Sequence, residues 1–90
     1  MALRNTRENE KFWLPHRELS NLLELHEELE NMQNELFNKH VNQEKNDFAR
    51  WIAWSIKDEE LANLLKQTNC KEKTRILIKG RINSLEYSKI

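Results

Sequence analysis

The sequence predicts an all-α fold, a compact bundle of four or five short helices. The chain has 90 residues with only one Gly, Gly80, and one Pro, Pro15, and it nearly lacks strand-favouring runs of Val, Ile, Thr and Tyr. Apolar residues instead recur at spacings of three and four, which is typical of helices with one buried face. This length supports one modest core. We therefore expect a single helical domain over residues 12–88.

The N-terminal segment before the helices is predicted in two parts. Residues 1–11 are polar, carry charges of both signs and lack periodicity, so we expect a mobile tail. Phe12–Leu14 then provides an apolar anchor, and Pro15 disfavours helix at the residue before it. We expect a short extended arm or strand packed over the helices.

Two helices are predicted next. Ser20 can accept a hydrogen bond from an unpaired amide of the first turn, and Glu24 adds favourable charge there, so we expect a helix from Ser20 to about Met32. His26 lies at the edge of its apolar stripe, where an imidazole paired with a carboxylate is commoner than a metal ligand. A second, shorter helix is expected over residues 34–40.

The third and fourth helices are each predicted from a cap. Residues 42–45 have no apolar side chain to bury and are expected to form a surface loop. Asn46 suits the cap of a third helix, whose apolar residues recur at i, i+3, i+4, i+7 and i+8 from Phe48. Trp54 lies off this stripe and either closes the edge of the core or is available to a partner. Asp58 should cap a fourth helix that ends near Thr68 to Cys70.

The last helix, about residues 71–86, has two apolar sides. Gly80 costs about 1 kcal/mol in a helix interior unless close packing justifies it. The side that carries Gly80, with Ile76, Asn83 and Tyr87, could therefore admit another helix of this chain or of a second copy. The core predicted for the whole domain consists of Leu22, Leu25, Leu29, Phe37, Phe48, Trp51, Ile52, Leu61, Leu65, Ile78 and Ile82.

Charge and composition limit the function classes. The apolar runs are much shorter than the roughly 20 residues that cross a bilayer, the start has no secretory core, and the lone Cys70 forms no internal disulfide. A cytoplasmic protein without a membrane segment is expected. The net charge is zero, but residues 18–35 hold six Glu and no Lys or Arg, whereas residues 66–89 hold seven Lys or Arg. We expect the two segments to neutralise each other, within a chain or across a dimer.

A polar cluster between two aromatic-rich stretches is the candidate site: His40, Lys45, Asn46 and Asp47. One interpretation is structural, with Asn46 and Asp47 capping the third helix while His40 reaches across the loop to one of them or to a backbone group. The other is a site for a small anion or a peptide group. No Ser or Cys has a neighbouring His in a nucleophile arrangement, so we expect no catalytic residues.

Cofactor sites are not predicted either. His16, His26 and His40 belong to three different segments, and Cys70 has no Cys partner at a zinc-ligand spacing. A phosphate-binding glycine loop would require several glycines. We therefore expect neither a metal nor an organic cofactor.

Residues 36–62 contain the phrase F-x-x-H-V, then N-D-F, W-I and D-E-x-L-A, beginning at Phe37, Asn46, Trp51 and Asp58. In this phrase, and in the lead-in from Phe12, the chain resembles a small domain family of uncharacterised function found in archaeal and bacterial proteins. Over most of residues 12–86 the resemblance implies a shared fold, and it implies no activity. The chain departs from the family pattern at Trp54 and around Pro15.

The expected function is that of a non-catalytic helical interaction module, either self-associating or binding another protein. Its candidate interface residues are Trp54, Ile76, Gly80 and Tyr87. The alternative is nucleic-acid binding through the basic last helix, with phosphate contacts from Arg75, Lys79 and Arg81.

Overall fold

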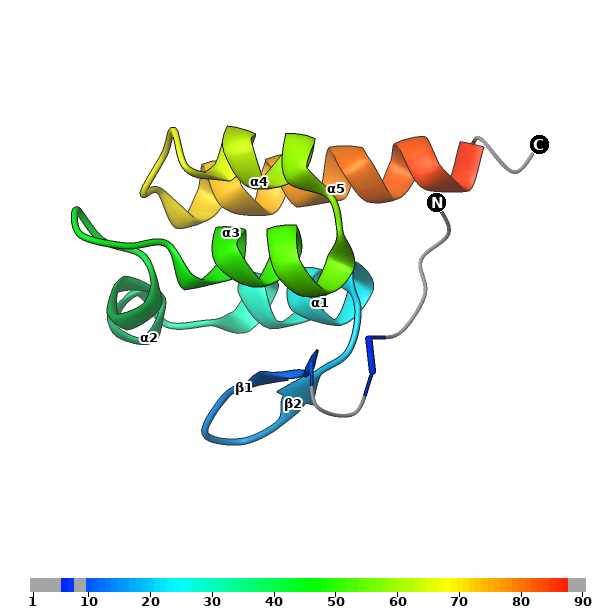
Figure 1. Ribbon diagram of the computed structural model, residues 1–90. Coiled ribbons are helices and arrows are strands. Elements are labelled where there is room, and N and C mark those ends of the chain that lie inside the picture. The colour runs from blue at the N-terminus through cyan, green and yellow to red at the C-terminus, as the bar shows by residue number, and fades with distance from the viewer. Residues whose placement is uncertain (1–5, 8–9, 88–90) are drawn as a thin grey trace.

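The computed structural model describes residues 6–7 and 10–87, with side chains up to Leu85, and confirms the predicted helical bundle (Figure 1). In this part of the chain a small hairpin precedes the helices. The elements are β1 (Phe12–Trp13), β2 (Glu18–Leu19), α1 (Leu22–Asn31), α2 (Asn34–His40), α3 (Asp47–Trp51), the π-helical turn η2 (Ile52–Ile56), α4 (Glu59–Leu65) and α5 (Lys71–Tyr87). Helix α5 packs along α1 and α4, while α3 packs against α4 and the hairpin lies beneath (Figure 1).

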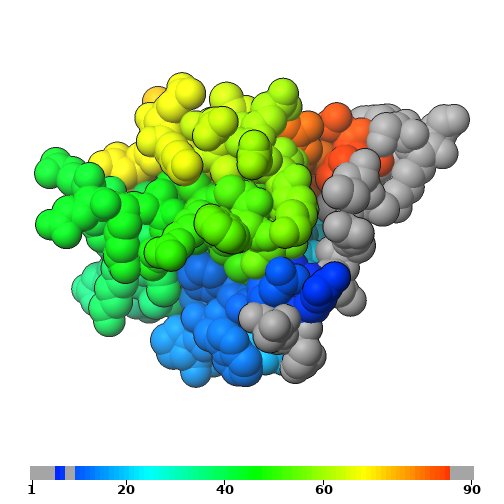
Figure 2. All heavy atoms as spheres, viewed as in Figure 1, coloured from blue at the N-terminus to red at the C-terminus, as the bar shows by residue number. Residues whose placement is uncertain are grey.

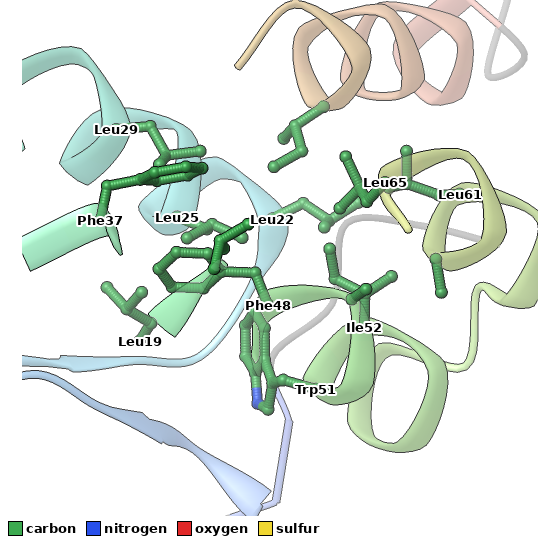
Figure 3. Close-up of a cluster of buried hydrophobic side chains, with 14 of the residues drawn as sticks. Leu19, Leu22, Leu25, Leu29, Phe37, Phe48, Trp51, Ile52, Leu61 and Leu65 are labelled. Atoms are coloured by element: carbon green, nitrogen blue, oxygen red, sulfur yellow. The ribbon is translucent and has the colours of Figure 1, made fainter. Parts of the chain in front are cut away.

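The core is the one predicted from the helical spacing. Every residue predicted for it is buried. The side chains of α1, α3 and α4 meet between the helices, and Phe37 reaches the same cluster from α2 (Figure 3). The hairpin and the loop after α2 add Leu14, Leu19 and Val41, which are also buried.

The predicted extended arm is one strand of an antiparallel hairpin. Phe12 pairs with Leu19 and Trp13 with Glu18, and the Leu14 amide donates to the Arg17 carbonyl at 2.9 Å. The sequence predicted the first strand but not its partner, because two residues are too few to show alternation.

Parts of the predicted mobile tail are described. The Thr6 amide donates to the Ser20 carbonyl at 2.7 Å, and Trp51 Nε1 donates to the Glu10 carbonyl at 2.7 Å. Residues 1–5, 8–9 and 88–90 lie outside the described residues.

The prediction of Ser20 as the cap of α1 is wrong by one residue. Asn21 is the N-cap, and its Oδ1 accepts from the Glu24 amide at 2.8 Å. Glu24 reaches back to accept from the Ser20 amide at 2.6 Å. Asn caps as well as Ser, and with the cap at Asn21 the Glu24 side chain pairs a second amide, that of the residue before the cap.

Two further helix boundaries differ from the prediction. The third helix is α-helical only to Trp51 and continues as η2 to Ile56. The next residue, Lys57, adopts a left-handed conformation with φ 68°. Helix α4 ends at Leu65 rather than near Thr68 to Cys70, because tighter turns follow it: the amides of Gln67 and Thr68 donate to the carbonyls of Leu64 and Leu65. The predicted caps Asn46 and Asp58 are confirmed.

Helix α5 buries one of its two predicted sides. Ile78 and Ile82 are buried and Leu85 is half-buried, whereas Ile76 is exposed. A Cβ built on Gly80 would meet no described atom within 4 Å. Within the described part of the chain, no helix covers this outer side, so close packing does not explain the glycine.

Gly80→Ala is therefore expected to stabilise the fold. Alanine restricts the unfolded chain and favours the helix by about 0.5–1 kcal/mol, and its methyl group finds open space. Urea denaturation of both proteins measures the difference. A decrease in the free energy of unfolding would contradict an open helical surface at this position.

Candidate functional site

The predicted polar cluster lies on the loop between α2 and α3. The loop is closed by a hydrogen bond from the Asn42 amide to the Lys45 carbonyl at 2.9 Å. An isolated bridge pairs Val41 with Asn46. Residues 42–45 are all exposed, as predicted. This geometry brings His40, at the end of α2, beside the first turn of α3.

Asn46 connects two helices. Its Oδ1 accepts from the Ala49 amide at 2.9 Å and caps α3. Its Nδ2 donates to the Leu65 carbonyl at 3.1 Å, at the end of α4. One amide side chain thus supplies an acceptor to the start of α3 and a donor to the end of α4. The cap was predicted, and the link to α4 was not.

His40 and Lys45 share one carboxylate. His40 Nδ1 and Lys45 Nζ each lie 3.0 Å from Asp47 Oδ2. The His40 ring also packs on two aromatic rings, with centroids 5.2 Å from that of Phe12 and 5.5 Å from that of Phe48. Burial raises the pKa of Asp47, but the hydrogen bonds and charges of His40 and Lys45 outweigh it, so the pKa lies below its ordinary value.

This geometry favours the structural interpretation of the cluster. The His40 ring is held by an aromatic contact on the hairpin, by one on α3 and by the Asp47 carboxylate. Among the described residues no Ser, Thr or Cys side chain forms a hydrogen bond with His40. The cluster can therefore hold the loop to the start of α3.

The stability contributed by Asp47 is expected to depend on pH. Because the native pKa is lower than that of the unfolded chain, the contribution is fully present above the ordinary pKa and is lost as the pH falls through the native pKa. The difference in free energy of unfolding between wild type and Asp47→Asn should be largest near neutrality and vanish in strong acid. Urea denaturation at several pH values measures it, with Glu44→Gln as the matched loop control. A difference that persists in acid would contradict the expectation.

Trp54 is exposed, so the first of its two predicted alternatives, closing the edge of the core, is wrong. It stands on η2, off the apolar stripe, and 72% of its surface is accessible. It lies beside the tryptophan hollow, a depression of about 420 Å³. The tryptophan hollow is lined by Phe12, Asp47, Arg50, Trp51 and Trp54.

A second depression, the lysine groove, was not predicted. It has a volume of about 710 Å³ and lies between loop 42–46 and residues 66–70, which Figure 2 shows in green at the left and in yellow above it. Its lining includes Lys45, Lys66, Lys73, Gln43, Gln67 and Asn69. These residues come from three separate segments, so no local pattern in the sequence indicates the groove.

The other candidate residues lie on α5. Arg75 forms an ion pair with Glu72, which lowers the pKa of the Glu72 carboxyl. Arg81 pairs with Asp58 at 3.0 Å and also with Glu60. Both arginines predicted to contact phosphate are thus engaged with carboxylates. Lys79 forms no ion pair among the described residues, and the side chain of Tyr87 lies outside them.

The three histidines stay apart. His16 and Arg17 pair with Glu28 of α1. His26 is buried rather than at the stripe's edge, with Nδ1 3.7 Å from Glu30 Oε1. Over the described residues, no three or more His, Cys, Asp or Glu side chains are placed to hold a metal ion. In the same part of the chain, no helix combines the length and apolar character needed to cross a membrane.

No family model, no curated protein and no solved structure matches the chain.

Proposed function

We propose that the protein is a non-catalytic interaction module that self-associates through the Trp54 surface. This surface consists of Trp54 and the other residues that line the tryptophan hollow. The observation that carries this proposal is a tryptophan 72% exposed beside a hollow that is partly aromatic. Tryptophan gains much from burial and is enriched among residues that dominate protein interfaces. Its partner is therefore expected to cover the indole.

A second copy of the chain fits this surface. In a two-fold symmetric dimer the same patch meets itself, so Trp54 of each copy faces the tryptophan hollow of the other. Phe12 and Trp51 supply apolar contact there, and the exposed Arg50 forms no ion pair among the described residues. A guanidinium at the rim can stack on the incoming indole ring.

The backbone holds Trp54 in place before association. The Asp58 amide donates to the Ile52 carbonyl at 3.1 Å across the end of η2. Ile52 is fully buried, and Asp58 caps α4 at the same point through its side chain. Such a preorganised residue loses less conformational freedom on binding than a side chain on a loose loop.

Light scattering over a range of protein concentrations tests the proposal, at low and at high salt. The wild type is expected to form a dimer that resists salt, because the contact is apolar. Trp54→Ala removes a central residue from both sides, each worth about 2 kcal/mol or more. The dissociation constant should rise on the order of a thousandfold.

Trp13→Ala is the matched control, since Trp13 is a second exposed tryptophan, at 68%, on the hairpin. It is expected to leave the dimer intact. Circular dichroism of both variants checks that the helices remain. A monomeric wild type under all conditions, or an equal loss in both variants, would refute self-association through Trp54.

A further inference from the structure

We propose that the lysine groove binds a phosphate-bearing ligand of nucleotide size or larger. This site is distinct from the Trp54 surface, because Trp54 does not line the groove. The proposal therefore holds or fails independently of self-association. It also differs from the predicted nucleic-acid surface on α5, whose arginines are engaged with carboxylates.

The charge in the groove favours an anion. Lys66 and Lys73 are exposed and form no ion pair among the described residues, whereas Lys45 is paired with Asp47. The only carboxylate that lines the groove is Glu44. In a chain of zero net charge, the two unpaired ammonium groups of Lys66 and Lys73 outnumber this one carboxylate and make the depression locally positive. Phosphate is the anion that such lysines commonly bind.

The groove also carries neutral hydrogen-bond donors. The side chains of Gln43, Gln67 and Asn69 are exposed in its lining and form no hydrogen bond among the described residues. Amide side chains can donate to phosphate oxygens and can both donate to and accept from the edge of a base. The volume of about 710 Å³ leaves room for a sugar and a base beside the phosphate groups.

The walls of the groove are organised without a ligand. Asn42 Oδ1 accepts from the Glu44 amide at 3.0 Å in one wall, and Thr68 Oγ1 accepts from the Cys70 amide at 3.1 Å in the other. The hydrogen bond from Asn46 to the Leu65 carbonyl ties the first wall to the end of α4, from which the second wall continues. Binding therefore does not have to order either loop, which favours affinity.

Fluorescence anisotropy tests the site with a labelled nucleoside triphosphate and with short labelled single strands of DNA and RNA. Binding is expected at low salt and should weaken as salt rises. The double variant Lys66→Gln, Lys73→Gln should lower the affinity. For a single strand, the slope of the logarithm of the binding constant against the logarithm of the salt concentration should become shallower by about 0.7 for each phosphate that the double variant no longer neutralises. Binding of the triphosphate alone would indicate a free nucleotide as the source, and binding of the strands would indicate a nucleic acid.

Lys79→Gln is the control, because Lys79 is an exposed lysine of α5 outside the groove. It should leave affinity and salt slope unchanged. NMR adds a readout independent of the variants: on addition of ligand, the side-chain amide signals of Gln43, Gln67 and Asn69 should shift. The proposal is overturned if neither probe binds, if Lys79→Gln loses as much affinity as the double variant, or if those signals stay fixed at saturation.

Discussion

Replacing Phe48 by alanine is expected to destabilise the fold by about 3–5 kcal/mol, the usual cost of emptying a buried aromatic site. Phe48 is fully buried, and its ring lies 5.0 Å from that of Phe12 and 6.0 Å from that of Phe37, centroid to centroid. The cavity would therefore open between the hairpin, α2 and α3. Such a loss is a large fraction of the total stability of a domain of this size.

Urea denaturation followed by circular dichroism measures this effect, with Leu23→Ala as the control. Leu23 lies on α1 but is 42% exposed, so its truncation should cost much less. Phe48→Leu keeps most of the apolar volume and should fall between the two. If Phe48→Ala lost no more stability than Leu23→Ala, the contacts of Phe48 with Phe12 and Phe37 would not be central to the core.

The sequence predicted the helices because their signals are local. The caps Asn46 and Asp58 each lie directly before an apolar stripe, and both accept from the amide three residues later. The core residues follow from the same spacing, since a 3.6-residue period decides which face of a helix is buried. Neither inference requires knowledge of what lies across the core.

The features that the sequence did not predict depend on contacts between distant residues. The hairpin needs Phe12 to meet Leu19. The link from Asn46 to α4 spans 19 residues. The cap of α1 was predicted at Ser20 and lies at Asn21, because both residue types suit the N-cap position. Local preference does not decide among such alternatives, and tertiary packing does.

The candidate sites also differ in whether local sequence or contacts between distant residues determine them. The contact of His40 with Asp47 was one of two interpretations of a short polar stretch, and it requires only that the loop turn back. The helical spacing placed Trp54 off the apolar stripe, but whether another element covers it depends on tertiary packing, and among the described residues it is exposed. The lysine groove combines loop 42–46 with residues 66–70, so it exists only once α3 and α4 are packed.

Asn46→Ala is expected to cost about 2 kcal/mol, because it removes two interactions from one side chain. Loss of the helix cap costs about 1 kcal/mol, and loss of the hydrogen bond to the Leu65 carbonyl costs about 1 kcal/mol more. The cost of losing this hydrogen bond is no larger than that, because the Leu65 carbonyl also accepts from the Thr68 amide and keeps a partner. Urea denaturation of the variant measures the sum.

Asn46→Ser separates the two terms. A serine hydroxyl can still cap α3, but it is too short to keep the hydrogen bond that Asn46 Nδ2 makes to Leu65. Asn46→Ser should therefore lose about half of what Asn46→Ala loses. The lost bond ties loop 42–46 to the end of α4, where the second wall of the lysine groove begins. Asn46→Ser should therefore also weaken phosphate binding. If Asn46→Ser were as stable as wild type, the cap alone would explain Asn46, and the rigid connection between the walls would have to come from elsewhere in the bundle.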